Sequence, residues 1–173
     1  MNSQADWLGF ELSDAQLLAL LKVCGIGALP GANLLIPDEQ AIDCAWRALA
    51  EEGVIWNAAD SLQAHYLLAG VLHTAAEAKR VFRLRAIGET FIVYENEGDW
   101  VCFLRKRGGF CLLIPVRTKK DAWNLTSGFA ESIEGHAAVQ INGKHVGRLG
   151  AAWKERLEWM WWSAFDAAPQ SNE

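Results

Sequence analysis

Hydrophobic residues recur at intervals of three and four along three segments in the first half of the chain. This spacing is typical of amphipathic helices. Each segment begins near a residue suited to a helix N-cap, and the first two are followed by glycine, which commonly ends a helix. The pattern predicts three helices, at about 14–24, at about 38–52, and from Asp60 or Ser61 to about 78, with a short apolar strand at 54–56.

The pattern changes at residue 79, after which apolar residues follow one another in short runs separated by polar or glycine-containing turns. Four such runs, at 81–87, 90–95, 99–105 and 109–116, predict a four-stranded antiparallel meander. The chain therefore combines a helical part with an antiparallel sheet, which is the pattern of an α+β protein.

The last third of the chain is predicted to form a helix, a β-hairpin and a second helix. Thr118 is suited to cap the first helix, which runs to about Ile133. Asn142-Gly143 lies between two apolar runs and is a strong hairpin signal. A single α+β domain is expected over 1–173, divided into a helical part at 1–78 that is winged-helix-like, a sheet at 79–117, and a helix-hairpin-helix part at 118–168.

Both faces of the predicted sheet are apolar, because large hydrophobic residues occupy consecutive positions in its strands. An antiparallel sheet with one face in water normally alternates apolar and polar residues. The second face must therefore be covered by the chain's own helices, by a second copy of the chain, or by another protein. If the cover is intermolecular, four residues are candidates for partner binding: Trp100, Phe103, Phe110 and Leu112.

The terminal helix, predicted within 151–165, is also apolar on two sides. Leu157 and Met160 belong to one stripe, whereas Trp159 and Trp162 point in roughly the opposite direction. Tryptophan is enriched at the centres of protein interfaces, because it removes a large apolar area from water. Trp159 and Trp162 are therefore further candidates for partner binding, and the alternative is a core helix that is buried on all sides.

Charge is segregated along the chain, although the net charge is only −5. Residues 1–78 contain two basic and ten acidic residues, whereas residues 79–120 contain ten basic and four acidic residues. The basic segment could face an anionic partner, or the acidic segments could neutralise it within one fold. Three consecutive cations in a predicted turn are the candidates for anion contacts: Arg105, Lys106 and Arg107.

No motif in the sequence predicts catalysis, a cofactor or a metal site. The four histidines lack the spacings of metal ligands, and the glycine-rich stretch at 25–31 follows a helix rather than a strand. Cys24, Cys44, Cys102 and Cys111 lack CxxC spacing and are expected to be buried, reduced thiols. We therefore expect a non-enzymatic protein that needs no cofactor.

Nothing in the sequence predicts insertion into a membrane. No apolar run approaches the roughly 18 residues that indicate a membrane-spanning helix. The first residues are acidic, whereas a signal peptide is basic and then apolar. A cytoplasmic location is expected.

The order of the first three helices and the strand at 54–56 is similar to that of a winged helix, which gives an alternative function as a DNA-associated regulator. The recognition helix of that fold supplies several basic side chains to the DNA. The predicted helix at 38–52 offers only Arg47 against five acidic residues. Nucleic acid is therefore not the expected partner, and any DNA contact would fall to the basic turn.

Small and aliphatic residues in two segments resemble the amino-terminal half of the EspG proteins, the cytosolic chaperones of mycobacterial type VII secretion. The matching residues are Gly25, Gly27, Leu29 and Pro30 in a loop, and Ala48, Leu49, Gly53 and Val54 at a helix end. The resemblance covers about residues 10–116, and the family's members are longer. It implies a chaperone or adaptor that holds a helical secretion substrate on an apolar sheet or loop surface, so the expected partner is another protein chain or a second copy.

Overall fold

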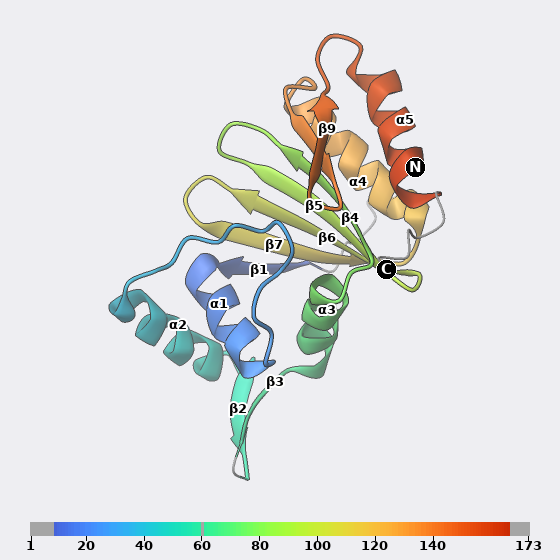
Figure 1. Ribbon diagram of the computed structural model, residues 1–173. Helices are drawn as coiled ribbons and strands as arrows, with labels where there is room; N and C mark the ends of the chain where they lie inside the picture. Colours follow the sequence, from blue (N-terminus) through green and yellow to red (C-terminus); the bar gives the residue numbers. More distant parts are fainter. Residues whose placement is uncertain (1–8, 60, 167–173) are drawn as a thin grey trace, which may run out of the picture.

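A computed structural model describes residues 9–59 and 61–166. Seven antiparallel strands form one sheet in the order β1-β7-β6-β5-β4-β8-β9 (Figure 1). Their bounds are Phe10–Ser13 (β1), Arg80–Arg85 (β4), Thr90–Asn96 (β5), Asp99–Lys106 (β6), Phe110–Val116 (β7), Ala138–Ile141 (β8) and Lys144–Arg148 (β9). A separate hairpin consists of β2 (Ile55–Ala58) and β3 (Ser61–Ala64).

The sheet lies between two layers of helices (Figure 1). The helices are α1 (Asp14–Val23), α2 (Glu39–Glu51), α3 (Tyr66–Ala76), α4 (Lys119–Ser132) and α5 (Trp153–Phe165). One face of the sheet packs against α1 and α3, with α2 resting on α1, and the other face packs against α4 and α5. The α+β class predicted from the sequence is confirmed.

Polar caps fix the starts of three helices close to their predicted positions. The Ser13 side chain accepts a hydrogen bond from the Gln16 backbone N–H, and the Gln16 side chain accepts one from the Ser13 N–H, which completes a capping box. Asp38 and Thr118 cap α2 and α4 in the same manner with single bonds to backbone N–H groups. These caps satisfy donors that a helix leaves unpaired in its first turn.

The four predicted meander strands are present as β4 to β7, and the predicted hairpin forms β8 and β9 around Asn142 and Gly143. The sheet nevertheless has seven strands rather than four. The hairpin extends the sheet because β8 pairs with β4, and β1 pairs with β7 at the opposite edge. The strand β1 escaped prediction because it is only four residues long and leads directly into the cap of α1.

The third helix begins later than predicted. Ser61 belongs to β3, which pairs with β2, and α3 starts at Tyr66. The His65 backbone N–H donates to the Val54 carbonyl at 2.8 Å, which closes the hairpin before the helix. Hairpin pairing satisfies the backbone groups of 55–58 and overrides the helical periodicity of the side chains. Asp60, the other predicted start, lies outside the described residues. The same holds for residues 1–8 of the predicted 1–78 part and residues 167–168 of the predicted 118–168 part.

Both sheet faces are apolar, as predicted, and the chain's own helices cover both of them. Phe103 is fully buried on the α1 and α3 side, and Trp100 is 8% exposed beneath α5, where its ring centroid lies 4.9 Å from that of Phe165. Leu112 is partly buried on the face of the sheet that α4 and α5 cover. The expectation of an open sheet face that offers Trp100 and Phe103 to a partner is therefore corrected, because α1, α3, α4 and α5 cover the strands.

The four cysteines are free thiols. Cys102 and Cys111 are buried as expected and Cys24 is partly buried. Cys44 is exposed, contrary to the expectation, because only Ala45 and Leu49 of α2 are buried and Cys44 lies away from them. Within 9–59 and 61–166, no helix has both the length and the apolarity needed to cross a membrane.

Candidate functional site

The outer face of α5 presents two exposed tryptophans. The exposed fraction is 68% for Trp159 and 45% for Trp162. Leu157, Met160 and Ala164, on the opposite side of the helix, are all buried. The predicted division of this helix into two apolar sides is confirmed, and only one of the two sides belongs to the core.

Trp161 anchors α5 to the sheet. Its side chain is fully buried, and its ring centroid lies 5.5 Å from that of Phe82 on β4 and 4.5 Å from that of Phe165. The role of Trp161 was not predicted from the sequence. Its spacing of four and three residues from Leu157 and Ala164 is the signal that could have placed it on the core side.

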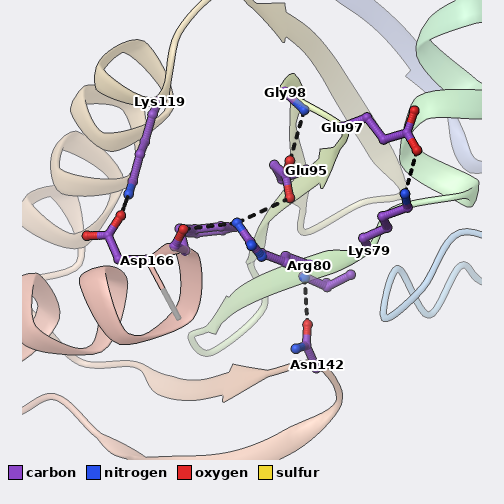
Figure 2. A network of polar contacts seen from close by, with 10 residues as sticks. Lys79, Arg80, Glu95, Glu97, Gly98, Lys119, Asn142 and Asp166 are labelled. Atoms are coloured by element: carbon purple, nitrogen blue, oxygen red, sulfur yellow. Dashed lines mark hydrogen bonds and ion pairs between the residues drawn. The ribbon is translucent and has the colours of Figure 1, made fainter. Parts of the chain in front are cut away.

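A polar network joins the carboxyl end of α5 to the central strands (Figure 2). Arg80 Nη1 donates to the Phe165 carbonyl oxygen at 3.0 Å and lies 3.8 Å from a carboxylate oxygen of Glu95. The other Glu95 oxygen accepts from the Gly98 backbone N–H at 2.9 Å. A cation at a helix carboxyl end satisfies a free carbonyl and opposes the negative end of the helix dipole. Arg80 therefore fixes the end of α5 on β4.

Lys119, at the start of α4, holds the Trp162 ring. Its Nζ lies 4.3 Å from the ring centroid of Trp162 and also pairs with the Asp166 carboxylate (Figure 2). A cation over an exposed aromatic face contributes about 0.5–1 kcal/mol. The contact leaves Trp162 45% exposed.

Acidic residues flank the two rings, and a pocket lies between the same helix and α4. Glu155 and Glu158 are exposed one helical turn before Trp159 and Trp162, on the same outer face. A pocket of about 220 Å³ lies between α4 and α5, and Glu158 is part of its lining. An apolar aromatic centre with a charged rim is the composition of a protein-binding surface.

The basic turn between β6 and β7 uses one of its three cations internally. Arg105 Nη2 donates to Asp14 Oδ2 at 2.7 Å, and Arg105 Nε lies 3.1 and 3.2 Å from the two carboxylate oxygens. Arg105 is therefore engaged by a carboxylate of the same chain, which corrects the expectation that it contacts an external anion. Lys106 and Arg107 are exposed.

Asp14 accepts further hydrogen bonds from the Leu35 backbone N–H at 3.1 Å and from the Cys111 thiol at 3.1 Å. Burial raises the pKa of Asp14, but the hydrogen bonds from Arg105, Cys111 and Leu35 outweigh burial and hold the pKa below its usual value. Burial, with the bond to Asp14, raises the pKa of the Cys111 thiol, so the thiol stays protonated and donates. The cluster ties α1 to β6, to β7 and to the loop between α1 and α2, which is a structural role.

Phe110 is 54% exposed at the start of β7. The turn that precedes β7 lies on the opposite side of the molecule from α5 (Figure 1). Phe110 and the two exposed tryptophans therefore do not form one continuous surface.

Among the described residues, no group of three or more histidine, cysteine, aspartate or glutamate side chains is placed to hold a metal ion. The outer face of α5 combines an anchored helix with two exposed aromatic rings, which suits binding.

Comparison with known proteins gives one informative similarity. Neither the known protein-family models nor the curated proteins contain a match to this sequence. Among solved structures, the fold is similar to that of the Mycobacterium tuberculosis type VII secretion system chaperone EspG5, solved in complex with the PE25-PPE41 dimer. The resemblance to EspG extends to the fold. The two chains are 14% identical, with a TM-score of 0.57 over 73% of this chain, and this chain spans about half (52%) of the EspG5 chain.

Proposed function

We propose that this protein is a non-enzymatic protein-binding module, a chaperone or adaptor in a type VII-like secretion process. The outer face of α5 holds its partner, which is another protein chain. The proposal is carried by the exposure of Trp159 and Trp162 on a helix that Trp161 and Arg80 fix to the sheet. The fold likeness to EspG5, a chaperone solved with a bound protein dimer, supports it.

The energetics favour binding at this face over other uses of the two rings. Solvent-exposed tryptophan contributes little to folding, whereas its burial at the centre of an interface is among the largest single contributions to affinity. Because the helix is already held in place, a partner would not have to order it. Preorganisation of this kind lowers the entropic cost of association.

Replacing Trp159 and Trp162 together by alanine should remove partner binding and leave the fold intact. The tagged protein would be isolated from its own cells, the retained chain identified by mass spectrometry, and its affinity measured with purified components. Loss of two interface tryptophans, at about 2 kcal/mol or more each, should weaken binding by roughly 700-fold or more. The melting temperature should stay within about 2 °C, as expected for surface substitutions.

The matched control replaces Lys106 and Arg107 by alanine, because both residues are exposed on a different element. This control should bind the partner with unchanged affinity. Equal affinity of the tryptophan variant and the unaltered protein would refute the proposal. A retained nucleic acid that is released by moderate salt and lost in the control variant would instead favour the DNA-associated regulator.

A further inference from the structure

Arg83 is a buried cation in the middle of the sheet. It lies on β4, opposite Ile92 of β5 and Gln140 of β8, and its exposed fraction is 8%. The backbone turn at Pro30 and Gly31 covers its side chain from the α1 and α3 side. Arginine is rarely buried to this extent unless a carboxylate is close to it.

No carboxylate of the described residues lies within 4 Å of the Arg83 guanidinium. Its Nη1 donates to the Gln140 side-chain oxygen at 3.1 Å, and its buried Nε has no hydrogen-bond partner. Burial lowers the pKa of Arg83, and the positive charge of Arg85 lowers it further, but a guanidinium stays charged at neutral pH. A buried positive charge without a counter-ion is costly, and such groups mark functional sites.

Arg83 lines a pocket of about 380 Å³ between the Pro30 turn and the β8–β9 turn. The side-chain oxygen of Gln140 accepts from Arg83, and that of Asn142 accepts from the Val81 backbone N–H at 2.9 Å. These bonds fix both amide orientations, because each oxygen is committed to an internal donor. The amino groups of Gln140 and Asn142 are left to donate, so the polar side chains of the pocket present donors.

The wall of the pocket is held in place. The Tyr94 hydroxyl donates to the Pro30 carbonyl oxygen at 2.9 Å, which ties the turn to β5. At Gly31 the backbone has a φ of +76°, and an added Cβ would lie 3.5 Å from Arg83 Cδ. The left-handed conformation favours glycine at this position and lets the turn lie close over the arginine stem.

We propose that this pocket binds a carboxylate group, with the Arg83 guanidinium as the main donor and the side-chain amino groups of Gln140 and Asn142 completing the site. The planar guanidinium carries N–H donors that can bond both oxygens of a carboxylate. The proposal is independent of the function proposed for α5, because the pocket lies on the opposite face of the sheet from that helix.

Two further cations extend the positive charge away from the pocket. Arg85 lies two residues along β4 from Arg83 and so shares its face of the sheet, and Arg148 shares that face through the pairings Arg85–Ala138 and Ala138–Arg148. Both side chains are exposed. A row of cations beside the pocket favours an acidic peptide segment over a lone small carboxylate as the source of the bound group.

The test measures binding of a fluorescein-labelled hexaglutamate peptide to the full chain by fluorescence anisotropy, with hexaglutamine as the uncharged probe and citrate as a competitor. Hexaglutamate should bind and hexaglutamine should not. Arg83→Met keeps an unbranched aliphatic side chain and removes the guanidinium N–H donors, so it should weaken hexaglutamate binding at least about tenfold. Lys106→Met, the charge-matched control on the other face of the sheet, should leave binding unchanged.

Gln140→Glu keeps the acceptor for Arg83 Nη1 and supplies an internal carboxylate, so it should block binding while raising the melting temperature. This variant retains Arg83 and tests the site even if Arg83→Met does not fold. If only citrate binds, and its binding depends on Arg83, the natural ligand is a small carboxylate. If only the peptide binds, and its binding depends on Arg83, the natural ligand is an acidic peptide segment. Equal loss in Arg83→Met and Lys106→Met, unchanged binding in Gln140→Glu, or no binding of either anion would overturn the proposal.

Discussion

Trp161→Ala should lower the free energy of unfolding by about 3–5 kcal/mol, which is the usual cost of truncating a fully buried tryptophan. The ring packs against Phe82, Trp123 and Phe165, and its removal would leave a cavity between α5 and the sheet. Chemical denaturation monitored by circular dichroism gives this free energy directly. The effect should exceed that of any exposed position on the same helix.

Two variants on the same helix test the reason for this effect. Trp161→Phe should cost less than Trp161→Ala, because it keeps an aromatic ring and also removes a buried indole N–H that has no hydrogen-bond partner. The Trp159→Ala, Trp162→Ala double variant should stay within about 1 kcal/mol of the unaltered protein. A double variant that is as unstable as Trp161→Ala would show that the outer rings belong to the core.

Asp14→Asn should destabilise the fold by about 3–5 kcal/mol, because it leaves the largely buried Arg105 guanidinium without its counter-charge. The substitution also weakens the bonds from the Leu35 N–H and the Cys111 thiol. In the double variant with Arg105→Met no unpaired charge remains. The double variant should therefore lose less stability than the sum of the two single variants.

The contribution of Asp14 should depend on pH in one direction. Its pKa in the folded chain lies below the usual value of 3.8, so the folded state favours the ionised carboxylate. The stability gained is fully present above pH 3.8 and is lost as the pH falls through the folded pKa. Denaturation midpoints of the unaltered protein and Asp14→Asn should therefore differ equally at pH 7 and pH 5, and the difference should begin to shrink as the pH falls below 3.8. A constant difference down to pH 2 would contradict the assignment.

Local sequence signals predicted most of the secondary structure. Asn142 and Gly143 defined the hairpin, Thr118 defined the start of α4, and the runs of apolar residues after residue 79 defined the meander. These features depend on neighbours within a few residues, which a sequence displays. The start of α3 was misplaced because pairing between β2 and β3 overrode the helical spacing.

Contacts between residues far apart in the chain could not be predicted from the sequence. Asp14 and Arg105 are 91 residues apart, so the arginine could not be distinguished from Lys106 and Arg107 by its surroundings in the chain. Arg83 was one of several basic residues in a strand, and only the fold shows that it is buried without a carboxylate. Apolar residues on both strand faces indicated cover on both sides, but not that α1, α3, α4 and α5 supply it.

We propose that the outer face of α5 is the protein-binding surface. The most direct measurement replaces Trp159 with a photo-crosslinking phenylalanine derivative in the chain's own cells, with the same replacement at exposed Glu52 at the end of α2 as control. We expect one dominant adduct with a second polypeptide from position 159 and none from position 52. Adducts from position 52 alone, or no adduct from position 159 while the protein still copurifies with its partner, would contradict it.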